Sequence, residues 1–358
     1  MLRDARVATI VLNYRDTEDT VACLAALQRS TSLDQRFVVV DNAAPGPAHD
    51  ALRAAVAAAT APASDVAVVA SGGNRGYAGG NNVGIRLALR RRPDFLLVVN
   101  PDLRVEPTTL ERLLATAAAV PDAAAVGPRI MHGDDNGGRN DKEVGGPPRI
   151  WFDGGVFDRS RAGATTHLNM GRTEREAPPG PPRDVDYVTG ACLLLRADAV
   201  RSVGLLPEEY FLYFEETDYC QQLAAAGWRL VVDPRARAVH HKRSSGDLPT
   251  PAYTYYMRRN KQLFARRMGL DEHAAVEEFR TVWIDPWRRN VSNRAPHWRP
   301  TFDALIDRAA ADAAAGVTGP VDLSAYPSAA EVTPADGTDG TDGTDETDGT
   351  AELQEEHA

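Results

Sequence analysis

The chain has 358 residues, of which 43% are hydrophobic and 25% are charged, so it can bury a sizeable core. Its formal net charge is −10, but residues 331–358 hold ten acidic side chains and no Lys or Arg. Subtracting these ten from the 50 acidic residues leaves 40, which equals the number of Lys and Arg. Residues 1–330 are therefore neutral overall, which argues against a protein that binds nucleic acid through clustered positive charge.

No stretch approaches eighteen consecutive apolar residues, so the sequence predicts no membrane-spanning helix. Met1–Asp4 leads into a strand pattern without the apolar core of a signal peptide. The three cysteines, Cys23, Cys192 and Cys220, are far apart and form no CxxC pair, which disfavours a disulfide framework or a zinc ribbon. We therefore expect a cytoplasmic protein.

Short apolar runs alternate with helical patterns along the first hundred residues. The runs predicted as strands are Val7–Leu12, Phe37–Val40, Val66–Val69 and Phe95–Val99. The segments predicted as helices are 17–28, 51–59 and 82–90. Continuous apolar strands separated by helices predict a parallel sheet that is covered on both faces.

The second half is more varied. Residues 107–119 predict a helix, and residues 123–126 predict a strand. Residues 132–182 are rich in Gly, Pro and charged residues and contain a hairpin-like piece at 150–157. This composition predicts a mobile lid. Further on we expect a helix at 215–226, strands at 228–232 and 236–240, and a mostly helical region at 251–316. The Gly-Thr-Asp repeats that follow cannot form a core, so the tail is predicted to be disordered.

Each of the four predicted strands is followed by polar residues. These are Asn13-Tyr14, Asp41-Asn42, Ser71–Asn74 and Asn100-Pro101-Asp102. Open α/β sheets bind ligands at the carboxyl ends of their strands, so four such segments favour a binding edge. Any one of them can equally be an ordinary turn, because Asn, Asp, Gly and Pro are turn residues.

The glycine-rich segment at 72–82 is not a GxGxxG fingerprint, and it follows the third predicted strand rather than the first. No GxxxxGK[ST] loop occurs. Both facts disfavour a dinucleotide-binding dehydrogenase and a P-loop enzyme. The glycines still indicate a close approach of the backbone, and we expect a helix that begins near Asn81 to offer free amides to an anion.

Two further motifs contain side chains whose oxygen or nitrogen atoms could bind a metal ion. Asp102 follows an apolar strand and can hold Mg²⁺ or Mn²⁺, which prefer oxygen ligands. His240-His241 closes the last predicted strand, where a pair of histidines favours contact with metal or phosphate. A solvated turn and structural histidines are the alternatives for these two motifs.

Three carboxylates, Glu215, Glu216 and Asp218, come directly after the aromatic run 210–214. Acidic residues at a helix N-terminus are favoured by the helix dipole without any function. An apolar wall beside a carboxyl raises its pKa, however, and can make it a general base near neutral pH. We therefore favour a catalytic interpretation over simple capping.

In this order, the segments resemble the family 2 glycosyltransferases with the GT-A fold, most closely the rhamnosyltransferase-like branch. The resemblance covers roughly residues 5–245. It rests on the segments 7–14, 38–42, 74–81, 100–102, 189–192, 210–218 and 240–241. It implies an α/β, GT-A type fold with a mostly parallel, Rossmann-like central sheet flanked by helices. The resemblance does not explain the helical C-terminal appendage, which is expected from the helical pattern at 251–316.

The resemblance also implies roles for single residues. A nucleoside-diphosphate sugar would be bound by Asn13, Tyr14, Asp41, Asn74, Gly76, Tyr77, Asn81, Asn100 and Asp102. Asp102 would hold the cation, Mg²⁺ or Mn²⁺, and His240 would approach the metal or the diphosphate. Glu216 would be the base within the pair Glu215-Glu216, with Asp218 left open as an alternative.

The implied organisation is a nucleotide-sugar-binding half at 1–130 and an acceptor and catalytic half at 131–248. A helical region at 249–330 and the acidic tail at 331–358 follow. The implied activity is a metal-dependent, inverting sugar transfer from a donor such as dTDP-rhamnose, as in polysaccharide biosynthesis. The acceptor would be a saccharide, a polyprenyl-linked molecule or a small molecule.

Three questions stay open at this stage. A nucleotidyltransferase and a non-catalytic nucleotide-sugar-binding module are the alternative functions. The basic segment with Arg258, Arg259, Lys261, Arg266 and Arg267 is either a solvated face or a contact for a membrane surface or a lipid diphosphate. The chain is therefore expected in the cytoplasm or peripherally at the inner face of the membrane, and a homodimer is one expected assembly.

Overall fold

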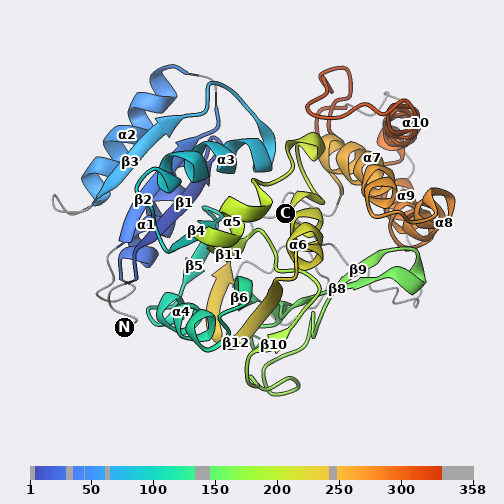
Figure 1. The fold of residues 1–358 in the computed structure, drawn as a ribbon. Coiled ribbons are helices and arrows are strands. Elements are labelled where there is room, and N and C mark those ends of the chain that lie inside the picture. Colours follow the sequence, from blue (N-terminus) through green and yellow to red (C-terminus); the bar gives the residue numbers. More distant parts are fainter. Residues whose placement is uncertain are drawn as a thin grey trace. The chain divides into compact units, whose positions relative to one another are not determined.

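The structure, a computed structural model, describes residues 5–29, 35–43, 45–60, 65–133, 146–241 and 248–332. The chain divides into two compact units, each visible in Figure 1. Unit 1 comprises residues 1–159, 163–244 and 318–320, and unit 2 comprises residues 160–162, 245–317 and 321–358. The tail from residue 333 onward and residues 134–145 of the predicted lid lie outside the described residues.

Unit 1 is built on a ten-stranded sheet with the order β10-β12-β6-β11-β4-β1-β2-β3, in which β5 pairs with β12 and β7 with β6. Its strands are β1 (Val7–Asn13), β2 (Gln35–Asp41), β3 (Val66–Ala70), β4 (Phe95–Val99), β5 (Leu103–Val105), β6 (Ala123–His132), β7 (Ile150–Phe152), β10 (Arg183–Asp184), β11 (Cys192–Arg196) and β12 (Arg229–His240). Strands β4, β1, β2 and β3 are parallel neighbours, as are β6 and β12, and β11 runs antiparallel between the two groups. The predicted α/β fold with a largely parallel central sheet is confirmed.

The helices of unit 1 flank this sheet (Figure 1). They are α1 (Thr17–Gln28), α2 (Pro47–Ala59), α3 (Gly76–Leu89), α4 (Thr109–Ala119), α5 (Ala197–Val203) and α6 (Glu215–Ala225). Asp16 caps α1 by accepting a hydrogen bond from the backbone N–H of Asp19, and α2 carries a proline in its first turn. The central strands are apolar on both faces because helices cover both, and every residue of β1 is buried.

Helix α3 begins at Gly76, earlier than the sequence predicts, and the glycine-rich segment is its first half. The reason is packing against the sheet. A Cβ on Gly84 would lie 2.6 Å from a side-chain carbon of Ile10, and one on Gly80 would lie 2.5 Å from Leu12. Glycine at these positions lets the helix lie against β1, which outweighs the low helix propensity of glycine.

Two other elements differ from the sequence predictions. The piece at 150–157 is not a hairpin, because β7 pairs with β6 while β8 (Gly155–Asp158) pairs with β9 (Ala164–His167). Residues 229–240 form one strand rather than two, with an irregularity between Asp233 and Arg237. The described part of the predicted lid is attached to β6 by a buried ion pair of 2.8 Å between Arg129 and Asp153.

Unit 2 is helical and has its own aromatic core. Its helices are α7 (Pro251–Arg267), α8 (Glu272–Phe279), α9 (Asp285–Arg294) and α10 (Arg299–Ala314). Phe279, Trp283 and Trp287 pack with ring centroids 5.7–6.2 Å apart. Across the described part of the chain, none of the helices is long and apolar enough to cross a membrane.

The basic segment predicted from the sequence lies in α7. Arg258, Arg259 and Lys261 are buried, at 7%, 0% and 2% exposure. Arg259 stacks on the ring of Tyr256 and Lys261 forms a 3.3 Å ion pair with Glu278, both within unit 2. These three side chains therefore form neither a solvated face nor an exposed basic stripe.

Candidate functional site

Polar residues lie together at one edge of the sheet in unit 1. Asn13 and Asp41 end β1 and β2 and are register partners in the parallel pair. Asn100 follows β4, the other parallel neighbour of β1. Because β11 is antiparallel, the residues just before it lie at the same edge, and the N–H of Asn100 donates to the carbonyl of Ala191 at 2.9 Å. The sequence prediction of a polar edge therefore corresponds to one continuous surface of the sheet.

Asp41 is held on both sides of its carboxylate. Oδ1 accepts hydrogen bonds from Asn13 Nδ2 at 3.4 Å and from the N–H of Ala43 at 3.1 Å. Oδ2 lies 2.9 Å from Nδ1 of His49, which α2 supplies. The aspartate is only 2% exposed, so its orientation is fixed by the chain. His49 was not found by sequence reasoning, because nothing in its local pattern relates it to Asp41.

Tyr14 is the first residue beyond this edge after β1. Its side chain is 45% exposed, and the guanidinium of Arg15 lies 5.3 Å from its ring centroid. Arg15 itself has a positive φ of 60°, so the chain turns sharply after the strand. An exposed ring beside buried polar groups can stack on a planar ligand such as a nucleobase.

The segment between β3 and α3 is tied to the end of β2. Asn42 Nδ2 donates to Asn74 Oδ1 at 3.2 Å and to the carbonyl of Gly76 at 3.0 Å. Asn74 Oδ1 also accepts from the N–H of Gly76. Asn81 is fully buried and donates to the carbonyl of Tyr77 within α3, so its side chain lies in the interior of the unit.

Asp102 and His240 meet because β5 pairs with the end of β12. Leu103 is the register partner of His240, and the N–H of His241 donates to the carbonyl of Asp102 at 2.9 Å. This pairing sets His240 Nε2 2.9 Å from Asp102 Oδ2. The imidazole is 2% exposed and the carboxylate 30% exposed, so it is the aspartate that faces outward.

The donor set is one carboxylate and one imidazole. Among the described residues, no group of three or more His, Cys, Asp or Glu side chains could enclose a metal ion. Mg²⁺ and related cations commonly bind through one or two carboxylates and complete their shell with water and substrate phosphates. Asp102 and His240 therefore fit a cation shared with a bound diphosphate, and they do not fit an all-protein metal cage.

The three acidic residues before the middle of α6 differ in their surroundings. Glu215 is 3% exposed, and its Oε2 has no hydrogen-bond partner within the described part of the chain. Asp218 is fully buried and accepts hydrogen bonds from the hydroxyl of Tyr210 at 2.8 Å and from Gln222 at 2.9 Å. Glu216 is partly exposed. Asp218 is thus tied into the interior, whereas Glu216 can reach a ligand.

Burial raises the pKa of both adjacent glutamates. The pKa of Glu215 lies well above its usual range because of burial and then because of the charge of Glu216. Burial also raises the pKa of Glu216, and hydrogen bonds from backbone amides, including that of Gly190, act in the opposite direction. A carboxylate with a raised pKa is a stronger base, which is the property that a proton acceptor near neutral pH requires.

Gly190 connects the carboxylate to the sheet edge. Its amide lies close enough to the carboxyl of Glu216 to lower the pKa of that group, and the carbonyl of the next residue, Ala191, accepts a hydrogen bond from the N–H of Asn100. Glu216 therefore lies beside the turn that carries Asp102. The structure brings together Asn13, Asp41, Asn100, Asp102, His240 and Glu216 along one edge of unit 1.

An aromatic group fills the space beside His240. The Trp151 ring packs 4.6 Å from the ring of His240 and 5.4 Å from that of His167, centroid to centroid. The positive charge of a protonated His167 would in turn favour the carboxylate form of Glu216. Trp151 and His167 come from β7 and β9, and sequence reasoning missed both because it did not predict that β7 pairs with β6 and β9 with β8.

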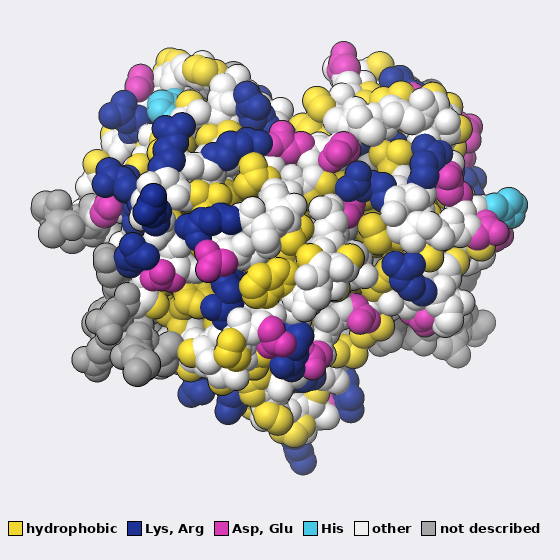
Figure 2. Space-filling view, viewed as in Figure 1, with side chains coloured by type: hydrophobic (Ala, Val, Ile, Leu, Met, Phe, Trp, Pro, Cys, Tyr) yellow, Lys and Arg dark blue, Asp and Glu magenta, His cyan; other side chains and the backbone are white. Residues whose placement is uncertain are grey.

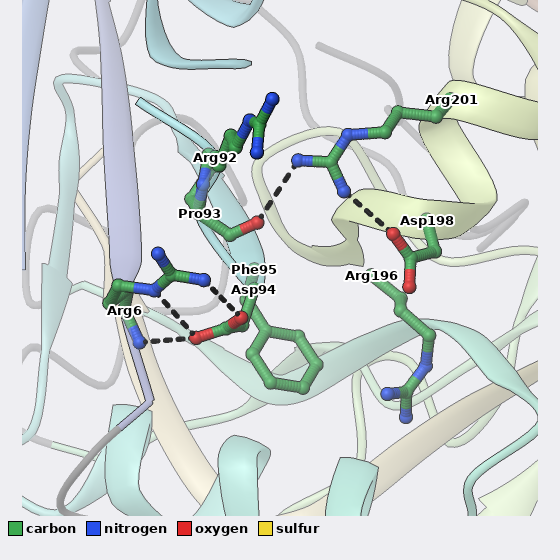
Figure 3. A pocket seen from close by; sticks show the side chains of 8 residues that line it. All are labelled: Arg6, Arg92, Pro93, Asp94, Phe95, Arg196, Asp198 and Arg201. Carbon is green, nitrogen blue, oxygen red and sulfur yellow. Dashed lines mark hydrogen bonds and ion pairs between the residues drawn. The ribbon is translucent and has the colours of Figure 1, made fainter. Parts of the chain in front are cut away.

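A separate pocket of about 450 Å³ lies at the opposite edge of the sheet (Figure 3). It is lined by Arg6, Arg92, Pro93, Asp94, Phe95, Arg196, Asp198 and Arg201. Arg6 pairs with Asp94 at 3.0 Å and Arg201 pairs with Asp198 at 2.6 Å, so both acidic groups of the lining are already neutralised. Figure 2 shows further Lys and Arg side chains over α2, α3 and β3. This pocket lacks the carboxylates and amides of the polar edge, and it is not the candidate site.

The comparison with known families covers Asn13, Asp41, Asn100 and Asp102 of this edge, whereas Glu216 and His240 lie beyond the matched range. The chain matches the family model described as glycosyl transferase family 2 over residues 8–202, which is more than half of its length. The chain belongs to glycosyl transferase family 2. The matched range contains β1 to β4, the turn at Asp102 and Gly190. The family resemblance predicted from the sequence is therefore confirmed.

Curated relatives of the chain are also glycosyltransferases by name. Over 157 residues it is 33% identical to the N-acetylglucosaminyl-diphospho-decaprenol L-rhamnosyltransferase of Mycobacterium tuberculosis, covering 42% of this chain and 48% of the relative. Over 226 residues it is 29% identical to the low-salt glycan biosynthesis hexosyltransferase Agl10 of Haloferax volcanii. This match covers 62% of this chain and 61% of the relative. The chain therefore spans about half to three fifths of the length of these relatives.

Solved structures show the same fold at low identity. A crystal structure of GalNAc-T7 with UDP, GalNAc and Mn²⁺ matches with a TM-score of 0.54 and 14% identity, covering 84% of this chain and 51% of the other. The mannosyltransferase PcManGT from Pyrobaculum calidifontis, in complex with GDP-Man and Mn²⁺, matches with a TM-score of 0.51 and 18% identity. This match covers 87% of this chain and 78% of the other. Both are GT-A glycosyltransferases, so the GT-A type of the fold is confirmed.

Proposed function

We propose that this chain is an inverting glycosyltransferase that moves a sugar from a nucleoside-diphosphate sugar to an acceptor hydroxyl. The observation that carries the proposal is the connection through Gly190 and Ala191, which sets the carboxylate of Glu216 beside the turn of Asn100 and Asp102. A base and a diphosphate site next to each other are what a single displacement at a sugar carbon needs. Family membership supports the reaction class.

The donor would lie along the polar edge. We assign the nucleoside to Asn13, Tyr14 and Asp41, with the exposed ring of Tyr14 against the base. Asn100 would lie near the ribose or the sugar, and Asn74 and Gly76 would shape the wall beside β2. Asn81 is buried in α3, so we assign it a structural role.

Asp102 and His240 would hold the divalent cation together with the donor diphosphate. When bound, Mg²⁺ or Mn²⁺ would supply positive charge against the negative charge of the leaving group. Both solved structures described above carry Mn²⁺ with a nucleotide, which supports a cation for this fold. His240 is buried and would keep the Asp102 carboxylate in one orientation.

Glu216 would act on the acceptor. Its carboxylate would take the proton of the attacking hydroxyl while the acceptor oxygen forms a bond to C1 of the sugar. The bond between C1 and the diphosphate oxygen breaks in the same step, and the nucleoside diphosphate leaves with its electron pair. Attack from the opposite face inverts the configuration at C1. Glu215 would stay protonated beside it, because its own burial and then the charge of Glu216 disfavour its carboxylate form.

The substrates are proposed from the names of the relatives. A rhamnosyltransferase that acts on N-acetylglucosaminyl-diphospho-decaprenol and a hexosyltransferase of glycan biosynthesis support a deoxyhexose or hexose donor, with dTDP-rhamnose first. They also support a saccharide carried on a polyprenyl diphosphate as the acceptor. The protein would then work in polysaccharide biosynthesis, in the cytoplasm or at the inner face of the membrane.

A panel of donors tests this proposal. We would incubate the protein and Mn²⁺ with dTDP-, UDP- and GDP-sugars and a polyprenyl-diphosphate N-acetylglucosamine acceptor, and measure the released nucleotide. We expect release of a nucleoside diphosphate with one donor and a product of inverted anomeric configuration. Binding also raises the melting temperature, because a ligand of the native state stabilises it. Release of pyrophosphate from a nucleoside triphosphate, or retention of configuration, would contradict the proposal.

A further inference from the structure

Tyr77, at the start of α3, joins two segments that surround Glu216. Its backbone N–H donates to the carbonyl of Phe211 at 2.8 Å. Its hydroxyl donates to the carbonyl of Gly190 at 2.6 Å. The backbone amide of Gly190 in turn lies close enough to Glu216 to lower the pKa of its carboxyl. One tyrosine therefore contacts both the loop that leads into α6 and the residue whose amide lies near the base.

The contacts on both sides of Tyr77 depend on glycine. A Cβ on Gly76 would lie 1.9 Å from the carbonyl oxygen of Phe211, and Gly76 also has a positive φ of 68°. A Cβ on Gly190 would lie 2.5 Å from the hydroxyl oxygen of Tyr77. No larger residue fits at either position without moving the backbone, so the close approach is specified by the sequence.

The loop held by Tyr77 has an unusual backbone. Phe211, Tyr213 and Phe214 have φ angles of 66°, 70° and 74°, in the left-handed region that bulky side chains rarely adopt. Such conformations persist where surrounding contacts hold them, and they concentrate at functional sites. The hydrogen bond from Tyr77 to Phe211 is one of these contacts, and the bond from the N–H of Asp218 to the carbonyl of Phe214 is another.

We infer that Tyr77 is a positioning residue, which orients the carboxylate of Glu216 through Gly190 and through the loop at Phe211. The inference rests on the proposed function, because it explains how the base is held. The same segment is linked to the donor edge, since the carbonyl of Gly76 accepts from Asn42 at the end of β2. Tyr77 thereby connects the proposed nucleotide site to the proposed base, rather than binding the donor itself.

The hydroxyl of Tyr77 is suited to remain a donor. Burial and the neighbouring carboxylates of Glu216 and Glu215 raise its pKa well above the usual value for tyrosine. The phenol therefore keeps its proton across the physiological range and donates to Gly190 throughout. A fixed donor at this point keeps the amide of Gly190 directed at Glu216.

The first test compares two tyrosine variants. Tyr77→Phe removes the hydroxyl and keeps the ring, and Tyr219→Phe removes a hydroxyl that donates to the carbonyl of Gly204 at 2.8 Å. With the donor used by the wild type, we expect Tyr77→Phe to lower kcat about tenfold, the rate equivalent of one hydrogen bond, with donor KM within about twofold. Tyr219→Phe should keep the wild-type kcat. Equal kcat values for wild type and Tyr77→Phe, or equal losses in both variants, would overturn the inference.

The second test does not depend on activity. Amide hydrogen exchange of the ligand-free proteins should be faster at 188–192 in Tyr77→Phe and at 211–217 in Gly76→Ala, relative to wild type and Tyr219→Phe. Unchanged exchange at both segments would overturn the inference. If the wild type transfers no sugar from any donor, the proposed function fails, and the exchange experiment still decides whether Tyr77 holds these two segments.

Discussion

At the scale of single residues, the raised pKa of Glu216 has a consequence for the pH dependence of transfer. Only the carboxylate form can accept a proton, and burial raises its pKa above the ordinary 4.5. As the pH falls, kcat should therefore decline through a pKa above 4.5, earlier than for a solvated glutamate. A pH–rate profile with saturating donor and acceptor measures this limb. An acidic limb at or below 4.5 would contradict the assignment of Glu216 as the base.

The raised pKa of Glu215 predicts how the stability of the fold depends on pH. Its pKa is raised in the folded protein, so the folded state binds more protons than the unfolded state, and stability falls as pH rises above 4.5 through the folded pKa. The Glu215→Gln variant has no titrating group at this position, so it does not lose stability in this way as the pH rises. In urea unfolding at pH 5, 6.5 and 8, the stability of Glu215→Gln relative to wild type should rise with pH. A difference that stays constant over this range would show that Glu215 is not perturbed by its burial.

At the scale of elements, the packing of α3 on the sheet determines the shape of the polar edge. A Cβ on Gly84 would lie 2.6 Å from Ile10 and 2.9 Å from Val40, both buried. Gly84→Ala should therefore lower the free energy of unfolding by about 1–3 kcal/mol through overpacking. Gly180→Ala is the matched control, because nothing lies within 4 Å of its Cβ. Urea unfolding of the two variants measures the difference, and equal stabilities would contradict the packing explanation for the early start of α3.

The element scale also shows where sequence reasoning succeeds. The apolar runs Val7–Leu12 and Phe95–Val99 are followed by polar residues, and the structure has the strands Val7–Asn13 and Phe95–Val99 there. It fails at the glycines of α3, because propensity disfavours a helix that tertiary packing requires. It also fails at 229–240, where two strands are predicted and the structure has a single strand with an irregularity between Asp233 and Arg237.

At the scale of the whole molecule, the strand order determines which residues meet. Asn13, Asp41 and Asn100 could be grouped from the sequence, because parallel strands end at one edge. The contacts of Asp41 with His49 and of His240 with Trp151 could not, since they depend on the position of α2 in the fold and on the pairing of β7 with β6. Long-range pairings of this kind leave no periodic signal in the sequence. Unit 2 lies largely beyond the residues that the family model matches, which end at 202.

The central claim is that Glu216 is the base of a sugar transfer at this edge. The most direct test is the kcat of Glu216→Gln, measured by release of the nucleoside diphosphate, with the donor Kd of both proteins measured by calorimetry. We predict a loss of about two to four orders of magnitude in kcat, the usual contribution of a general base, with donor Kd within about twofold. Turnover by Glu216→Gln at the rate of the wild type would contradict it.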